Sequence, residues 1–331
     1  MRSILRPVVA GAVLVFALGI GPALTQSKIA VSYFPGPAAA PIFVASAHGN
    51  FAKEGLAVTA APTEGSVAQI TAMLDDKYQI GFGGLDDVIG YDVGQGEVAV
   101  AGRPDLFAFM GTDTGTLHLV AAPGIKTVES LKGKTLAVDA KSTGFAFVLY
   151  RIAALHGLKP GDYSVLSVGS SQKRFAALAQ GEAQAALLFK PVADQLLAKG
   201  FADVMEVSSA LPHYQAAVAL ARRSWAEKHR AQLTGFIRAY VAATRWLADP
   251  ANKAEAIAIL MKDMPNLSPA AAQGTYAAAA SLGSAGAIGR MDLQGVATVV
   301  ALRAEYGAPK KKKLGDSHRF YDLSYYRTAM K

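Results

Sequence analysis

The chain has 331 residues, enough for two domains of ordinary size, and 52% of them are hydrophobic, which excludes a disordered protein. It contains no cysteine, which excludes disulfides, thiol catalysis, thiolate metal sites and a lipid-modified cysteine anchor. The formal charge is +8, but residues 309–331 alone hold seven basic and two acidic residues. A solvated basic C-terminal tail explains this charge better than a nucleic-acid-binding face, which needs basic residues spread over a folded surface.

Residues 1–25 predict a secretory signal peptide. Arg2 and Arg6 precede the apolar run Val8–Ile20, and small residues follow that run. The run is shorter than a membrane-spanning helix, so an uncleaved membrane anchor is the less favoured alternative. We therefore expect a mature chain that begins near Gln26 and is periplasmic, without a lipid anchor.

Two stretches in the two halves of the chain resemble copies of one unit, a short helix followed by a turn and a buried strand that ends at a loop. These are Ser66–Leu74 with Ile80–Phe82, ending at Gly83–Asp86, and Ser170–Leu178 with Ala185–Phe189, ending at Lys190. Similar strands upstream, at Ala30–Ser32 and Ala137–Asp139, extend each half to β-α-β-α-β. Ligands of open α/β sheets bind at the carboxyl ends of strands, so two copies predict two lobes that face one ligand. The alternative is that any two βαβ units look alike in sequence.

The remaining elements follow from turn residues and apolar runs. Strands are expected at 28–32, 98–101, 117–121, 135–138, 204–207 and 215–221, and helices at 38–47 and 144–156. The polar segment Gly111–Thr116 and the segment Leu211–Tyr214 are the expected crossings between the lobes.

The chain after residue 223 is predicted to be helical and to pack against the first lobe. Two capping boxes are expected, Ser66 with Gln69 in the first copy and Ser224 with Glu227 here. Asp249 and Ser268 each precede a proline and are expected to cap helices, and the last helix is expected at Met291–Tyr306.

No signature of catalysis or of a cofactor is present. The six histidines include no His-x-x-x-His pair, there is no Gly-x-Ser-x-Gly motif, and the glycines of Gly81–Asp86 lack the spacing of a dinucleotide loop. We therefore predict no enzyme, no metal and no cofactor. His213, at a predicted crossing, is the one histidine that could serve an exported enzyme as a base.

The positive signal is a set of loops that offer amide groups, hydroxyls and aromatic faces. Helix starts at Ser66, at Ser142 and Thr143, and at Ser170 present backbone N–H groups that suit an anion. Aromatic side chains near these loops could cover an apolar ligand body. Phe82, in mid-strand, fits the core better than the ligand, and Asp86 could cap a helix or meet a ligand hydroxyl or amine.

At this point the residues resemble a known family. Pro37-x-x-x-Pro41-Ile42-Phe43-Val44-Ala45 and Gly49–Val58 resemble the start of solute-binding proteins of the nitrate, taurine, alkanesulfonate and pyrimidine-precursor (NMT1-like) uptake systems. Ile125–Lys134 is similar to the opening of the family's second lobe, and Ala179–Ala185 to its second helix–turn–strand. The eukaryotic precursor-synthase branch depends on a cysteine-rich segment, which this chain lacks.

The resemblance implies the α/β, two-lobed periplasmic-binding-protein fold (type II), in which each lobe is a mixed open sheet flanked by helices and the ligand cleft lies between the lobes. Lobe 1 would comprise residues 26–110 and 215–308, lobe 2 residues 111–214, and the basic tail residues 309–331. The family's ligand contacts fall on the loop after the first strand, on helix starts and on crossings. The corresponding positions are Ser32, Tyr33, Phe34, Gly65, Ser66, Gly83, Gly84, Asp86, Asp113, Thr114, Ser142, Thr143, Gly144, Phe145, Ser170, Lys190 and Tyr214.

The sequence thus predicts a monomeric receptor that delivers a small organic anion, a sulfonate or an aromatic or heterocyclic carboxylate, to the permease of an ABC importer, with no nucleic-acid partner. Helix-start amides and Lys190 would hold the charged group, and Tyr33, Phe34, Phe145 and Tyr214 the body. An exported enzyme on the same frame, or a sensor that presents its ligand to a membrane receptor, are the alternatives.

Overall fold

The computed structural model describes residues 26–331 except 101, 103, 113–116, 265–266, 285–287, 312 and the side chain of Ser284. The predicted signal peptide, residues 1–25, lies outside the described residues, and so do Asp113 and Thr114 of the first predicted crossing. Within the described ranges, no helix is both long and apolar enough to cross a membrane.

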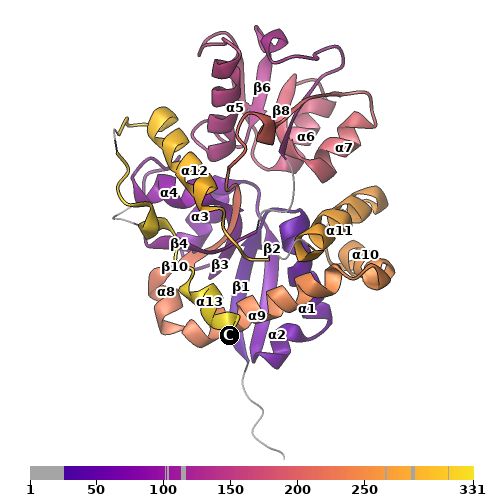
Figure 1. Cartoon of the computed structure of the whole chain (residues 1–331), viewed down its shortest axis with the longest axis vertical. Helices are drawn as coiled ribbons and strands as arrows, with labels where there is room; N and C mark the ends of the chain where they lie inside the picture. The colour runs from indigo at the N-terminus through magenta and orange to yellow at the C-terminus, as the bar shows by residue number, and fades with distance from the viewer. Residues whose placement is uncertain are drawn as a thin grey trace, which may run out of the picture.

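The strands form two five-stranded sheets, each in its own lobe (Figure 1). Lobe 1 has the order β2-β1-β3-β10-β4, with β1 (Ser27–Tyr33), β2 (Leu56–Pro62), β3 (Ile80–Gly84), β4 (Leu106–Gly111) and β10 (Ala217–Arg222). Lobe 2 has the order β7-β6-β8-β5-β9, with β5 (Leu117–Ala121), β6 (Thr135–Val138), β7 (Ser164–Ser167), β8 (Ala185–Phe189) and β9 (Ala202–Glu206).

The two sheets have the same topology. In lobe 1, β1 runs parallel to β2 and β3, and β10 lies antiparallel between β3 and β4. In lobe 2, β6 runs parallel to β7 and β8, and β5 lies antiparallel between β8 and β9. Each lobe therefore receives one strand, β5 or β10, directly after the chain crosses from the other lobe. The predicted fold of two mixed α/β sheets is confirmed, and the two copies of the sequence repeat end in the equivalent strands β3 and β8.

Helices cover both faces of each sheet. In lobe 1 and around it lie α1 (Ala40–Ala47), α2 (Asn50–Lys53), α3 (Ser66–Leu74), α4 (Leu85–Asp92), α8 (Arg223–Lys228), α9 (Arg230–Leu247), α10 (Lys253–Asp263), α11 (Pro269–Ser284), α12 (Leu293–Tyr306) and α13 (Ser324–Ala329). Lobe 2 carries α5 (Gly144–Leu155), α6 (Ser171–Ala179) and α7 (Lys190–Leu197). Short 3-10 turns stand at Pro37–Ala39, Glu129–Leu131, Val207–Ser209, Pro250–Asn252 and Ser317–Phe320.

The long helix α9 shows how sequence spacing fixes the core of lobe 1. Leu233, Phe236, Ile237, Tyr240 and Val241 recur every three or four residues, so they share one face of the helix. That face packs against α1, α2 and the sheet, and the ring of Phe236 stacks on Phe51 of α2 with centroids 5.1 Å apart.

Both predicted capping boxes are wrong. Helix α3 begins at Ser66 itself, with Gly65 as its cap, and the Gln69 side chain donates instead to the carbonyls of Ser32, at 3.1 Å, and Phe82, at 3.2 Å. The Gln69 side chain therefore bonds to carbonyl groups of the sheet and not to the start of its own helix. Ser224 lies within α8, and its N–H donates to the Asp105 carboxylate at 2.7 Å.

The two caps predicted before prolines are confirmed. The Asp249 side chain accepts a hydrogen bond from Ala251 N at 2.9 Å. Ser268 Oγ accepts one from Ala271 N at 3.2 Å. The proline at the first helical position fixes the local backbone, so these caps depend only on residues that are close together in the sequence.

Three other expectations are corrected. The described part of the predicted strand 98–101 is irregular chain, because β4 starts only at Leu106, where pairing with β10 begins. The C-terminal segment is folded onto lobe 1 and is not a solvated tail: Phe320 is 0% exposed, and Asp322 N donates to Ala108 O at 2.9 Å. The last helices do not pack on lobe 1 alone, because α11 contacts α7 and α12 contacts α5.

Candidate functional site

A cavity lies between the two lobes, at the carboxyl ends of strands from both sheets. It encloses about 830 Å³, part of it open to solvent. Ligands of open α/β sheets bind at this edge, and here two such edges face each other. Its lining comprises Phe34, Pro35, Gly36, Pro37, Ala38, Phe82, Gly83, Gly84, Asp86, Asp87, Thr112, Asp139, Thr143, Gly144, Phe145, Ser171, Arg174, Phe189, Tyr214, Ala216 and Ala217.

Aromatic side chains from both lobes form much of this lining. Phe34 and Phe82 come from lobe 1, and the Phe82 ring also packs on Tyr240 in the core, with centroids 5.2 Å apart. Phe145 and Phe189 come from lobe 2, and their rings meet edge to face with centroids 5.6 Å apart. Such walls suit a flat, apolar ligand body, which would contact both lobes at once.

Two adjacent carboxyl groups follow strand β3 in the first turn of α4. Asp86 is held by Arg303, whose Nε donates to Asp86 Oδ1 at 2.9 Å and whose Nη2 donates to Oδ2. Arg303 also lowers the pKa of Asp87, but other causes outweigh it. Burial, and then the nearby carboxylates of Asp86 and Asp139, raise the pKa of Asp87 well above its usual range. In its protonated form the Asp87 carboxyl can donate one hydrogen bond and accept another.

Asp139 follows β6 in lobe 2, the strand equivalent to β1. Its Oδ2 accepts a hydrogen bond from Ser66 N, the first amide of α3 in lobe 1, at 3.2 Å. The space is tight, because a Cβ added to Gly65 would lie 2.9 Å from Asp139 Oδ1. The start of α3, predicted to hold a ligand anion, therefore receives a carboxylate from the opposite lobe.

Arg174, in α6, places a cation at the cavity. The residue is 2% exposed, and its guanidinium donates to Leu187 O at 3.2 Å, Gly169 O at 2.8 Å and Ser171 Oγ at 2.9 Å. It lies 5.8 Å from the centre of the Phe145 ring. Burial lowers the pKa of Arg174 to about 10, so the side chain remains charged at neutral pH.

Thr112, at the end of β4, supplies a buried hydroxyl. Its Oγ1 has no hydrogen-bond partner among the described residues, and the residue lines the cavity. A buried polar atom without a partner is costly. A ligand that hydrogen-bonds to this hydroxyl would remove that cost.

About half of the predicted contact residues line this cavity. These are Phe34, Gly83, Gly84, Asp86, Thr143, Gly144, Phe145 and Tyr214. Ser32, Tyr33, Gly65, Ser66, Ser142, Ser170 and Lys190 do not. Asp113 and Thr114 lie outside the described residues.

Packing explains two of the residues that lie off the lining. The Tyr33 ring turns into the core of lobe 1, 5.5 Å from the Phe43 centroid, and burial raises the pKa of Tyr33 to about 12. Lys190 turns to solvent, where its Nζ donates to Asp194 at 2.8 Å, one helical turn further along α7.

Asp87, Asp139, Arg174 and Thr112 were not predicted from the sequence. Asp139 follows the end of a strand, as Asp86 does, so the repeat could have been used to predict Asp139 at the cavity. Arg174 carried none, since on a predicted amphipathic helix an arginine indicates a solvent-facing position.

The described residues contain no group of three or more histidine and acidic side chains placed to hold a metal ion. His213, the candidate base of an enzyme, lies off the cavity lining. Its Nδ1 is 2.9 Å from Asp292 Oδ2, and both side chains are largely exposed.

Comparison with known proteins supports the fold. A family model described as the NMT1-like family matches residues 23–261, and no curated protein matches the sequence. One similar solved structure is a protein of Bordetella bronchiseptica RB50, with 19% identity, a TM-score of 0.71, and coverage of 92% of this chain and 97% of that chain.

Two further similar structures carry functional descriptions. One is the ligand-binding component of an ABC-type import system from Staphylococcus aureus with zinc bound, with 12% identity, a TM-score of 0.68, and coverage of 92% of this chain and 99% of that chain. The other is the alkanesulfonate-binding protein SsuA from Xanthomonas axonopodis pv. citri bound to MOPS, with 19% identity, a TM-score of 0.65, and coverage of 83% and 91%. At these identities the likeness shows a shared fold.

Proposed function

Because the chain belongs to the NMT1-like family, we propose that it is a periplasmic solute-binding protein, which takes a small molecule between its lobes and delivers it to the permease of an ABC importer. The observation that carries this proposal is the cavity whose walls come from both lobes. A ligand that contacts both walls favours the closed arrangement, because it shifts an equilibrium between two states only by its difference in affinity for them.

The lining favours a flat heteroaromatic solute. Its ring would lie between the aromatic side chains of the two lobes, since Phe34 and Phe145 line the cavity and are partly exposed. The raised pKa of Asp87 favours its protonated carboxyl, which suits a ring edge that carries an N–H donor beside a nitrogen acceptor, since the two groups can form paired hydrogen bonds. Thr112 Oγ1 would serve a further polar substituent.

The organic anion predicted from the sequence retains one supporting feature, Arg174. The other features that suggested an anion are otherwise engaged, because Lys190 pairs with Asp194 and the start of α3 binds Asp139. An aromatic carboxylate would place its charge at Arg174. It would also bring its charge near the carboxylates of Asp86 and Asp139, so we rank it second to a neutral or weakly basic heterocycle.

We propose binding, without turnover, as the activity. Catalysis of the predicted alternative kind would need a base at the cavity, and His213 lies off the lining, paired with Asp292. Transport and sensing use the same ligand site, and the ABC importers named for structures of this fold favour transport.

An isothermal titration calorimetry screen tests the proposal. The purified chain is titrated with aminopyrimidines and other N-heterocycles, benzoates and pyridine carboxylates, alkanesulfonates, and nitrate and sulfate. We expect the tightest binding among the heterocycles, unchanged in Lys190→Ala, a control outside the cavity. Tight binding confined to sulfonates or inorganic oxyanions would refute the ligand class, and no binding from any class would refute the receptor function.

A further inference from the structure

Helix α12 belongs to the hydrophobic cores of both lobes. Val296 and Val299, in its first half, pack in the cluster of lobe 1 that includes α4 and β4. Leu302, one turn later, packs in the core of lobe 2 with Phe147 of α5. The ring of Tyr306 stacks on Phe147 with centroids 5.9 Å apart. Figure 1 shows α12 beside both α4 and the upper lobe that contains α5.

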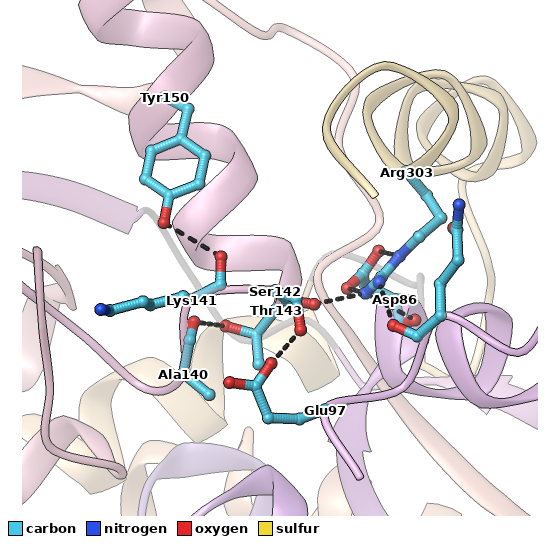
Figure 2. A network of polar contacts seen from close by, with 9 residues as sticks. Asp86, Glu97, Ala140, Lys141, Ser142, Thr143, Tyr150 and Arg303 are labelled. Atoms are coloured by element: carbon cyan, nitrogen blue, oxygen red, sulfur yellow. Dashed lines mark hydrogen bonds and ion pairs between the residues drawn. The ribbon is translucent and has the colours of Figure 1, made fainter. Parts of the chain in front are cut away.

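Arg303 ties the two lobes together at the same place. It is 1% exposed, and besides its ion pair with Asp86 it donates to Gln95 O at 3.0 Å in lobe 1 and to Ser142 O at 2.9 Å in lobe 2. Its guanidinium lies 4.5 Å from the centre of the Phe147 ring. Figure 2 shows Arg303 reaching from α12 to Asp86 on one side and to Ser142, just before α5, on the other.

Both ends of this connection reach the ligand cavity. Asp86 lines it from lobe 1, and Thr143 to Phe145, which follow Ser142 directly, line it from lobe 2. The two walls are in close contact here, because a Cβ on Gly144 would lie 2.6 Å from Asp86 Cβ. Arg303 therefore sets the distance between two walls of the cavity without lining it.

On the opposite side of the cavity, between α6–α7 and the first lobe, Ser170 N donates to Glu64 O at 3.1 Å, but the two side-chain contacts there are exposed. Lys173 Nζ lies 2.5 Å from Glu64 Oε2, and these side chains are 48% and 77% exposed. Gln172 Nε2 donates to Pro35 O at 3.1 Å, also in an exposed position. Water can replace such contacts at little cost. Separating α12 from lobe 2 would instead expose Leu302 and break the hydrogen bond from Arg303 to Ser142 O.

We propose that α12 is a fixed third connection between the lobes, in addition to the two crossings of the chain, and that Arg303 is its positioning residue. When the lobes open, lobe 2 rotates about α12, so the α6–α7 side separates from α10 and α11 while the α5 side stays in contact. The start of α5 and Asp86 then keep their spacing in the open form, and half of the cavity is preformed before a ligand enters.

Distance measurements between spin labels test this proposal on the whole chain without any ligand, so the result does not depend on the proposed ligand class. The chain has no cysteine, so introduced pairs label cleanly. One pair, Ala198→Cys with Met261→Cys, spans the α7–α10 side, and another, Leu155→Cys with Ala301→Cys, spans the α5–α12 side; all four positions are exposed. We expect several distances, or one broad distribution, for the first pair and a single narrow distance for the second.

Removing the connection that Arg303 makes should broaden the distribution of distances for the α5–α12 pair. Because Arg303→Met alone leaves a buried carboxylate, which could unfold the chain, the variant is Asp86→Asn with Arg303→Met. Glu54→Gln with Arg238→Met removes an ion pair within lobe 1 and is the matched control; it should leave the α5–α12 distance narrow. Circular dichroism confirms that each variant is folded.

Three results would overturn the proposal. The first is an α5–α12 distribution in the unmodified background as broad as the α7–α10 distribution, or an α7–α10 distribution as narrow as the α5–α12 one. The second is a narrow α5–α12 distance in the folded Asp86→Asn, Arg303→Met variant. The third is equal broadening in the control, which would show a general loosening of the chain.

Discussion

In the proposed function, the protonation state of Asp87 would decide which ligands the cavity accepts, and replacing Asp87 with asparagine tests that state. Burial and the nearby carboxylates raise the pKa of Asp87 well above the ordinary value of 3.8 that it has in an unfolded chain. Between these two pKa values the folded protein binds a proton that the unfolded chain has lost. The free energy of unfolding therefore falls as pH rises through this interval, and it becomes constant above the folded-state pKa.

The size of the effect follows from one proton. Such a group changes the free energy of unfolding by about 1.4 kcal/mol per pH unit within the interval. Asparagine has a similar shape and no titrating proton. The free energy of unfolding of Asp87→Asn, relative to that of the wild type, should therefore rise with pH at about this slope. Because the Asp86 carboxylate acts on Asp87, the difference reports the coupled titration of the two groups.

Urea unfolding at half-unit steps between pH 5 and pH 8 measures the difference. Asp263→Asn, at an exposed position of α10, is the control and should show a flat difference. A stability difference between the wild type and Asp87→Asn that does not vary with pH, or a wild type that gains on the variant as pH rises, would refute a neutral Asp87. The ligand class proposed above would then lose its main polar partner.

Three further substitutions test the cavity and the C-terminal segment. Phe145→Ala removes an aromatic wall and should weaken the heterocycles found by calorimetry at least tenfold, or about 1.4 kcal/mol; unchanged affinity would place the ligand elsewhere. Gly144→Ala puts a Cβ 2.6 Å from Asp86 Cβ and 2.7 Å from Tyr214 Oη, so it should cost about 1–3 kcal/mol and hold the lobes apart, which a larger radius of gyration in X-ray scattering would reveal and an unchanged one would contradict. Phe320→Ala should lower the free energy of unfolding in urea by about 3–5 kcal/mol, and a loss under 1 kcal/mol would show that the segment packs loosely.

The repeat in the sequence predicted the architecture correctly, because the positions of helices and strands depend on patterns within a few neighbouring residues. Ile80–Phe82 and Ala185–Phe189 are apolar runs preceded by helices, and they became the equivalent strands β3 and β8. The glycines at Gly83 and Gly84 marked a strand end, and the structure places both on the cavity lining. Local composition sufficed in each case.

The polar partners in the cavity could not be predicted in the same way. Asp139 meets Ser66 across 73 positions of sequence, and Arg303 meets Asp86 across 217. The first pair joins the two lobes and needs them closed, and the second needs α12 packed on lobe 1. Lys190 was predicted to contact the ligand because the sequence places it at the end of a repeat. The sequence does not determine which rotamer its side chain adopts, so the ion pair with Asp194 could not be predicted.

The C-terminal segment shows the limit of reasoning from charge. Its run Lys310–Lys313 suggested a chain in solvent, but Leu314, Phe320 and Tyr325 in the same segment are buried against lobe 1. Apolar residues spaced among charges can anchor a segment whose net charge is high, because the charged groups stay in water while the apolar ones pack.

A crystal structure with the tightest heterocycle from the calorimetric screen tests the central claim most directly. We expect closed lobes, the ring between Phe34 of lobe 1 and Phe145 of lobe 2, and hydrogen bonds from the ring edge to Asp87. A ligand seated outside this cavity, or one that binds to a single lobe and leaves Asp87 without a contact, would contradict the account.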